Sequence, residues 1–218
     1  MRIPGFKSGF VPLFLLAYGM SSASLAAAAT TQPSLADRLS QIQISPQKIQ
    51  QAAAAGKRTA SFCFNCHGTE GHSTHPETPN LAAQNAAYLL VQMQKFVDGR
   101  RKYPFMEGLL KELTDEEKVN IAVYFSSIPA RKNPPGDPAL MSRGKQIFSQ
   151  VCHVCHGDKG LGNEQIARIA SQQTPYLIKS LTLYRSRTGE RKDPLMSKVA
   201  SQLTDADIQA VAAYISSL

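Results

Sequence analysis

Two six-residue stretches decide how this sequence is read: CFNCHG at residues 63–68 and CHVCHG at residues 152–157. Each contains the pattern C-x-x-C-H, which is the attachment signature of a c-type heme. On a helical turn, residues at positions i, i+3 and i+4 project from one face, so two thiols can form thioethers with the heme vinyl groups while the adjacent imidazole faces the iron. The sequence therefore predicts two covalently attached hemes c, one on Cys63, Cys66 and His67 and the other on Cys152, Cys155 and His156.

Three other uses of paired cysteines fit this spacing less well. A C-x-x-C pair also occurs in thioredoxin-like redox sites, but that motif follows a strand and gives no role to the next histidine. Two pairs can form a four-cysteine zinc site, in which they usually lie about 15 to 20 residues apart. Two disulfides, the default for a secreted chain with four cysteines, would not require His67 or His156.

The heme motifs belong to an internal repeat with an offset of 88 to 90 residues. Order and spacing agree along the whole repeat, which indicates two copies of one domain. The matching segments are 63–68 with 152–157, 87–89 with 175–177, 103–106 with 193–196, 113–115 with 203–205, and 124–127 with 214–217.

The joint between the copies is visible in the composition. Residues 129–138 read PARKNPPGDP, and prolines with a glycine end helices and make a semi-rigid connector. We therefore expect one heme-binding domain over residues 30–128, a linker over 129–137 and a second domain over 138–218.

Both copies have a helical pattern, so the predicted fold class is all-α. The last segment of each begins at a threonine N-cap, Thr114 or Thr204, followed by acidic residues that suit the positive end of the helix dipole. Glu117 completes a capping box with Thr114, and Asp207 is a shorter approximation of one with Thr204. Apolar residues then recur at helical spacing, and no run alternates convincingly as a strand would.

Residues 1–29 have the features of a secretory signal peptide. Arg2 and Lys7 give a basic start, residues 10–20 are apolar, and Ala27 to Ala29 offer the small side chains that a signal peptidase needs. The alternative is an uncleaved membrane anchor, because the apolar stretch is close to spanning length. We expect an exported chain that begins near Thr30.

The net charge of +8 is spread unevenly. Residues 30–130 contain 10 Lys and Arg against 9 Asp and Glu, whereas residues 131–218 contain 12 against 7. Nucleic acid is not an expected partner of an exported protein. The basic second half is therefore expected to steer an acidic protein partner or to balance acidic groups of a cofactor, with ordinary solubility as the alternative.

The repeat also selects candidate axial ligands. Of the methionines after the signal, only Met106 and Met196 occupy equivalent places, 39 and 40 residues past their heme-binding histidines. Met93 and Met141 have no such counterpart and are interpreted as core packing. His72 and His75 compete as ligands at the first heme. Methionine opposite histidine raises the heme potential and leaves no open coordination position, which favours electron transfer over catalysis.

With these motifs, the chain resembles a diheme cytochrome of the cytochrome c4 type, two class I cytochrome c domains in tandem. The resemblance also rests on Pro79 to Gln84 followed by Tyr88-Leu89, and it covers nearly the whole mature sequence. It implies an all-α fold, a periplasmic location and the transfer of single electrons. The implied partners are redox proteins such as a terminal oxidase, a bc1-type complex or a periplasmic dehydrogenase, and peripheral membrane association is compatible with it.

The same resemblance implies that a carbonyl of a Pro-x-Leu segment accepts a hydrogen bond from Nδ1 of the iron-bound histidine. Pro79 and Leu81 match this pattern, but the second copy has Ala167-Arg168-Ile169. We therefore expect a less preorganised second loop and two hemes of different potential. Basic residues before each axial methionine are expected to compensate heme propionates and to dock an acidic partner, with a solvated loop as the alternative: Arg100, Arg101, Lys102, Arg185, Arg187, Arg191 and Lys192.

The sequence leaves open two alternatives to a free electron shuttle. One is the cytochrome subunit of a periplasmic dehydrogenase. The other is a diheme enzyme such as a peroxidase, which needs an open distal site that the paired Met106 and Met196 argue against. Residues 33–46 have no counterpart in the second copy and are expected to form an extra helical turn or two, or a partly ordered arm.

Overall fold

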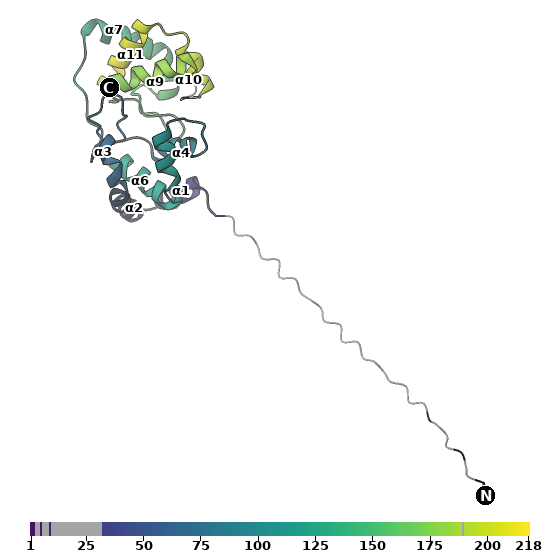
Figure 1. Ribbon diagram of the computed structural model, residues 1–218. Coiled ribbons are helices and arrows are strands. Elements are labelled where there is room, and N and C mark those ends of the chain that lie inside the picture. The colour runs from purple at the N-terminus through teal and green to yellow at the C-terminus, as the bar shows by residue number, and fades with distance from the viewer. Residues whose placement is uncertain (3–4, 6–8, 10–31, 189) are drawn as a thin grey trace. The chain divides into compact units, whose positions relative to one another are not determined.

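The computed structural model describes residues 1–2, 5, 9, 32–188 and 190–218 (Figure 1). Residues 33–218 form one compact unit. The described residues fold into helices and loops without a strand, which confirms the predicted all-α class. The predicted signal peptide, residues 1–29, lies almost entirely outside the described residues. In the described part of the chain, no helix is long and apolar enough to cross a membrane.

The helices fall into two series that follow the repeat. We call residues 33–128 the first half and residues 138–218 the second half. The first half contains α1 (Leu35–Gln43), α2 (Pro46–Thr59), η1 (Ala60–Phe62), α3 (Phe64–His67), α4 (Ala86–Val97), α5 (Pro104–Lys111) and α6 (Asp115–Ser127). The second half contains α7 (Pro138–Ile147), η2 (Phe148–Cys152), α8 (His153–His156), α9 (Thr174–Ser186), α10 (Pro194–Ala200) and α11 (Asp205–Ser217).

The last helix of each half begins as predicted. The Thr114 hydroxyl accepts from the Glu117 amide at 3.2 Å, and the Glu117 carboxylate accepts from the Thr114 amide at 2.8 Å. Thr204 and Asp207 make the same reciprocal pair at 3.2 and 3.0 Å. The shorter aspartate therefore completes a full capping box.

A glycine lies where the last helix of each half crosses the helix that precedes the heme motif, α2 with α6 and α7 with α11. A Cβ built on Gly56 of α2 would lie 2.0 Å from the Asn120 carbonyl oxygen of α6. On Gly144 of α7 it would lie 2.1 Å from the Ala210 carbonyl oxygen of α11. Real Cβ atoms do not approach other heavy atoms within 3.0 Å, so each crossing requires the absence of a side chain.

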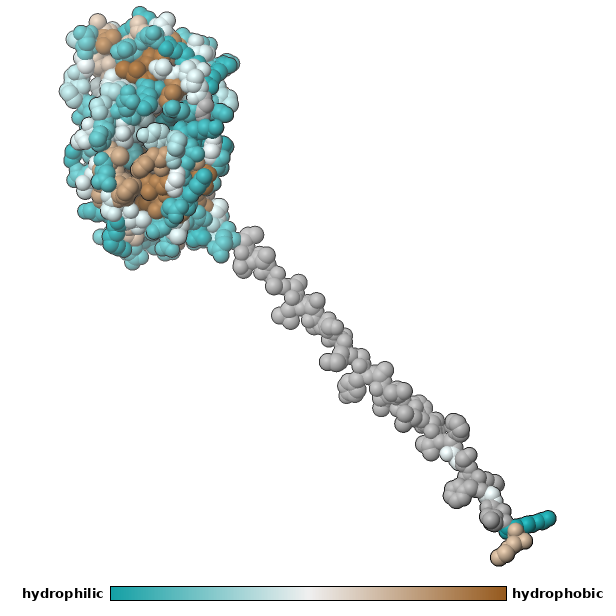
Figure 2. Space-filling model, in the orientation of Figure 1, coloured by the Kyte–Doolittle hydropathy of each residue, from teal (hydrophilic) through white to brown (hydrophobic). Residues whose placement is uncertain are grey.

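The apolar core of the first half is the larger one. Helix α1, which covers most of residues 33–46, is capped by Ser34 and inserts Leu39 into this core with 3% of its surface exposed. The extra segment is thus a packed helix. Buried residues that form the second core are Phe148, Leu177, Val211, Ala212 and Ile215. In the view of Figure 2, apolar side chains gather over both halves, with polar side chains between them.

Candidate heme sites

Each C-x-x-C-H motif begins at the N-cap of a short helix that ends at a glycine. Helices α3 and α8 end at Gly68 and Gly157, whose φ angles of 76° and 75° favour glycine. The four cysteines are free thiols; the first of each motif is half-buried and the second is exposed. Unpaired thiols spaced i, i+3 on one helical turn are the donor set that thioether attachment requires.

The histidine of each motif is oriented by a backbone carbonyl. Nδ1 of His67 lies 2.9 Å from the Pro79 carbonyl oxygen, and Nδ1 of His156 lies 2.9 Å from the Ala167 carbonyl oxygen. Such a bond places the proton on Nδ1 and leaves Nε2 free to bind a metal. Burial lowers the pKa of both imidazoles more than the carbonyl bonds raise it, which favours the neutral form that binds iron.

The expectation of a less preorganised second loop is wrong for this hydrogen bond. Ala167 places its carbonyl at the same distance as Pro79 does. A common turn holds both loops: the Leu81 and Ala82 amides donate to the Gly71 carbonyl, and the equivalent amides of the second half donate to Gly160. Because this turn needs no proline, the loop keeps its shape without one.

Met106 and Met196 occupy matching places, each in the first turn of a short helix with proline at its start, and both are half-buried. These helices, α5 and α10, pack against α4 and α9 respectively. Asp193 caps α10 by accepting from the Met196 amide at 3.1 Å. Met93 lies in the core with 9% exposure, as expected, whereas Met141 is half-buried on α7.

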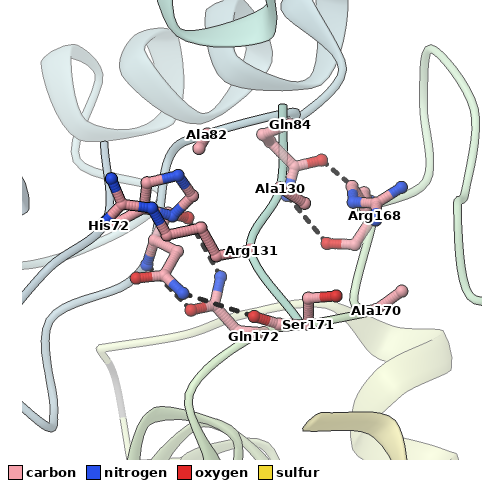
Figure 3. Close-up of a pocket in the computed structure, with 10 residues that line it drawn as sticks. His72, Ala82, Gln84, Ala130, Arg131, Arg168, Ala170, Ser171 and Gln172 are labelled. Atoms are coloured by element: carbon pink, nitrogen blue, oxygen red, sulfur yellow. Dashed lines mark hydrogen bonds between the residues drawn. The ribbon is translucent and has the colours of Figure 1, made fainter. Parts of the chain in front are cut away.

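The two competing histidines, His72 and His75, have contacts of their own. His72 lines a small cavity between the halves (Figure 3). Burial, and next the nearby Arg131 cation, lower the pKa of its imidazole, while the Pro129 carbonyl accepts a hydrogen bond from it. His75 is exposed, and the Gln173 side chain binds its carbonyl.

A cluster of arginine and tyrosine side chains is buried between the halves. Arg191 is 8% exposed and donates to the hydroxyls of Tyr184, at 2.9 Å, and Tyr176. Arg101 donates to Tyr176 at 3.4 Å, and the backbones of the two arginines pair as an isolated antiparallel bridge. Burial raises the pKa of the neighbouring Tyr88 to about 12.

No carboxylate of the described residues pairs with this cluster. Among the described residues, no ion pair joins Arg101 or Arg191 to an acidic side chain. Burial, followed by repulsion from Arg191, lowers the pKa of Arg101. Buried cations are costly unless they are paired. Two guanidiniums beside phenol groups therefore fit an acidic cofactor such as a heme, whose propionates would supply the missing charge.

Backbone and amide groups also join the halves next to both histidine loops. Gln84 binds the backbone of Arg168, and Gln172 binds the backbone of Asn80, each through both atoms of its amide. Figure 3 shows the Gln84–Arg168 pair beside a cavity of about 10 Å³, which is room for one water. Asn85 and Gln173, the next residues, bind other carbonyls of the opposite half.

Gln84 lies within the segment 79–84 that matches the family, but the sequence alone does not predict a role for it. Gln84 and Gln172 are 88 residues apart, which is the repeat offset. Comparing residues 80–85 with the second copy would therefore have matched these two glutamines. The glycines at the helix crossings, Gly56 and Gly144, also repeat at that offset and were missed as well.

Comparison with known proteins gives consistent results. The Cytochrome c family profile matches residues 141–218. A cytochrome c4 of Pseudomonas aeruginosa is 36% identical over 180 residues, a match that covers 76% of this chain and 88% of that protein. The crystal structure of reduced cytochrome c4 from Pseudomonas stutzeri superimposes with a TM-score of 0.70 at 34% identity, over 76% of this chain and 98% of that one.

A further relative is named for the enzyme from which it accepts electrons. The thiosulfate dehydrogenase electron acceptor of Thiomonas intermedia is 30% identical over 182 residues, which covers 74% of this chain and 81% of that protein. The predicted architecture of tandem class I cytochrome c domains is confirmed, as are the two covalently attached hemes c and the role in electron transfer. With paired C-x-x-C-H helices and carbonyl-oriented histidines in both halves, this chain belongs to the cytochrome c4 family of diheme electron-transfer proteins.

Proposed function

We propose that the chain passes single electrons between redox proteins through two hemes with His/Met ligation. Cys63 and Cys66 attach the first heme, and His67 and Met106 ligate its iron. Cys152 and Cys155 attach the second, with His156 and Met196 as ligands. The observation that carries this proposal is the matched pair of 2.9 Å bonds that orient the two histidines.

The chain's own groups suit fast electron transfer. Each heme c supplies a one-electron couple when bound. The carbonyls of Pro79 and Ala167 fix the rings of His67 and His156, so ligation changes little between oxidation states. A methionine on the opposite side would leave no open position for oxygen or peroxide.

Arg101 and Arg191 are proposed to hold the propionates of the two hemes. Both guanidiniums are buried between the halves, and Tyr176 bridges them with its hydroxyl. Charge-assisted hydrogen bonds to carboxylates would satisfy these groups and orient the acidic edge of each heme toward the other half.

Exposed apolar side chains next to the attachment motifs suit brief docking of redox partners. Phe62 precedes Cys63 and stacks on Phe105, which precedes Met106; their ring centroids lie 6.2 Å apart, and both rings are more than half exposed. At the equivalent positions the second half exposes Val151 and Leu195. We propose that these side chains form small apolar docking surfaces, one beside each attachment motif.

The same proposal covers the location of the chain, its domains and its partners. Residues 1–29 are a signal peptide that directs the chain to the periplasm. Residues 30–128 and 138–218 are the two cytochrome c domains, and residues 129–137 are the linker. Terminal oxidases, bc1-type complexes and periplasmic dehydrogenases are the proposed classes of partner, and peripheral membrane association is compatible with all three.

A second candidate role is that of an electron-accepting subunit. The resemblance to the thiosulfate dehydrogenase electron acceptor of Thiomonas intermedia favours it. Copurification from the native source separates the roles: a stoichiometric dehydrogenase chain would support the subunit role, and a monomeric cytochrome would support the free shuttle.

Single Met106→Ala and Met196→Ala variants test the ligation. The ferric methionine-to-iron charge-transfer band should lose about half its intensity in each and disappear in the double variant. Met93→Leu is the matched control, because Met93 lies in the core and should leave the band intact. An unchanged band in Met106→Ala would refute that ligand, and adding His72→Ala would then show whether His72 replaces it.

A further inference from the structure

One peptide group in each half connects its axial histidine to the other half. In the second half, the peptide between Ala167 and Arg168 accepts from His156 Nδ1 through its carbonyl, at 2.9 Å. Its N–H donates to Oε1 of Gln84, at 2.8 Å. A single resonance-stabilised unit thus joins a histidine of the second half to a side chain of the first.

The first half has the same arrangement, with the glutamine supplied by the second half. The peptide between Pro79 and Asn80 accepts from His67 Nδ1 at 2.9 Å and donates to Oε1 of Gln172 at 2.8 Å. In both cases the glutamine Nε2 returns a bond to the next carbonyl, at 2.8 Å on Arg168 and 3.0 Å on Asn80. Each glutamine therefore clamps the loop of the opposite half with two hydrogen bonds.

The backbone that aims these glutamines is strained in both halves. Ala83 and Ser171, the residues before Gln84 and Gln172, have φ angles of 56° and 61° although neither is glycine. Their amides are held by carbonyls of the last helices, at 3.0 Å on Phe125 and 3.2 Å on Ile215. Strained residues of this kind persist where the surrounding structure requires them and cluster at functional sites.

Both glutamines are buried, each with 7% of its surface exposed. Hydrogen bonds are stronger in a low-dielectric interior, and linked bonds polarise one another. The clamp is therefore shielded from bulk water, although the small cavity beside it has room for one water molecule, and the polarisation of the peptide is transmitted to the histidine.

We propose that Gln84 and Gln172 are positioning residues that each tune the heme of the opposite half. Gln84 acts on the heme held by His156, and Gln172 acts on the heme held by His67. The inference rests on the proposed ligation of the two irons by these histidines.

The sign of the effect follows from peptide polarisation. A hydrogen bond accepted from the peptide N–H increases the electron density on its carbonyl oxygen, which then accepts more strongly from histidine Nδ1–H. The histidine becomes more electron-donating and stabilises the ferric state. Removing the glutamine amide should therefore raise the potential of the opposite heme.

The test is a redox titration of the holoprotein carrying Gln84→Leu or Gln172→Leu, in which leucine keeps much of the side-chain volume. Heme methyl NMR signals, assigned to each heme through the Met106→Ala and Met196→Ala variants, report the two potentials separately. With linked bonds strengthened by roughly 10–30%, we expect a rise of about twofold to fourfold in the reduction equilibrium constant of the opposite heme. That is about 18–36 mV at ~59 mV per tenfold for one electron.

The expected pattern is crossed: Gln84→Leu raises the potential of the second heme and leaves the first unchanged, and Gln172→Leu does the reverse. Asn85→Ala and Gln173→Ala are matched controls, because each removes bonds to the opposite half without touching either histidine-linked peptide. Gln84→Ala and Gln172→Ala replace the leucine variants if those do not fold.

Any other pattern overturns the inference. Shifts confined to the heme of the mutated half, equal shifts of both hemes, or the same shifts in the controls would mean that the glutamines only hold the halves together. Failure of the proposed ligation would look different, because the methionine-to-iron band would then persist in Met106→Ala or Met196→Ala before any glutamine is changed.

Discussion

The segment that leads into each heme motif follows a different path in the two halves. From the crossing glycine to the first cysteine there are seven residues in the first half, Gly56 to Cys63, and eight in the second, Gly144 to Cys152. The first half takes a tight 3₁₀ turn, η1, and the second takes a wide π turn, η2. The helix crossing and the attachment motif are thus kept, and the turn between them absorbs the extra residue.

The histidine loops show the same principle. Pro79 has no counterpart in the second half, yet Ala167 presents its carbonyl at the same 2.9 Å. Asn163 organises the second loop instead, with its side chain accepting from the Gln165 and Ile166 amides at 2.9 Å. The contact between the motif histidine and a loop carbonyl is thus the same in both halves, whereas Pro79 in one loop and Asn163 in the other differ.

The largest effect should come from closing the helix crossings. Gly56→Ala and Gly144→Ala would each place a Cβ about 2 Å from a carbonyl oxygen of the partner helix, so the helices must separate. We expect each to lower the free energy of unfolding by about 3 kcal/mol, at the upper end for overpacking. Thermal unfolding of the holoprotein measures this loss.

A glycine with free space around it provides the control. Gly108 lies in α5, and a Cβ built on it meets nothing within 4 Å. Gly108→Ala should be neutral or stabilise by up to ~1 kcal/mol through helix propensity. If Gly144→Ala proved as mild as Gly108→Ala while Gly56→Ala did not, the π turn of the second half would be absorbing the strain.

A smaller effect should separate the caps of α6 and α11. Hydrogen bonds from Thr204 hold the pKa of Asp207 down to about 2, and Arg143 of α7 adds to this by donating to the same carboxylate at 2.6 Å. Glu117 has bonds from Thr114 but no arginine partner, because residue 55, which corresponds to Arg143, is alanine. Asp207→Ala should therefore cost about 1 kcal/mol, and more than Glu117→Ala does.

The pH dependence of stability tests whether the charged carboxylate of Asp207 stabilises the fold. Because the folded pKa of Asp207 lies below the value of 3.8 for the free side chain, its stabilisation is complete above about pH 4 and is lost as the pH falls through about 2. The difference between wild type and Asp207→Ala in unfolding titrations should vanish across that window. A difference that persisted well below pH 2 would show that packing, and not the charged cap, carries the effect.

Much of the fold and half of the site could be predicted because their signals are local or repeated. The attachment motifs and the Thr114 and Thr204 caps occupy a few consecutive residues. The repeat also singled out Met106 and Met196, whose ligation stays a prediction. The repeat could have matched Gln84 with Gln172 but not predicted their contacts, because Gln84 and Arg168 are 84 residues apart and nothing in either segment indicates that they meet.

The burial of Arg101 and Arg191 could not be predicted from the sequence either. Arg101 and Arg191 were counted among many basic residues, with solvated loops as an equal alternative. Their burial against Tyr176 depends on how the halves pack, which composition does not record. The expected weakening of the second loop failed for a related reason, since the Gly160 turn replaces what proline was assumed to provide.

The smallest expected effect tests whether proline itself matters. Pro79→Ala gives the first half the residue that the second half already has at this position, and the carbonyl should stay in place because the Gly71 turn and Gln172 still hold it. The first heme should keep its potential, and stability should fall by only about 0.4–1 kcal/mol through the added freedom of the unfolded chain. Redox titration and thermal unfolding of the same sample measure both. A shifted potential would show that proline itself tunes the first heme, beyond holding the carbonyl that His67 contacts.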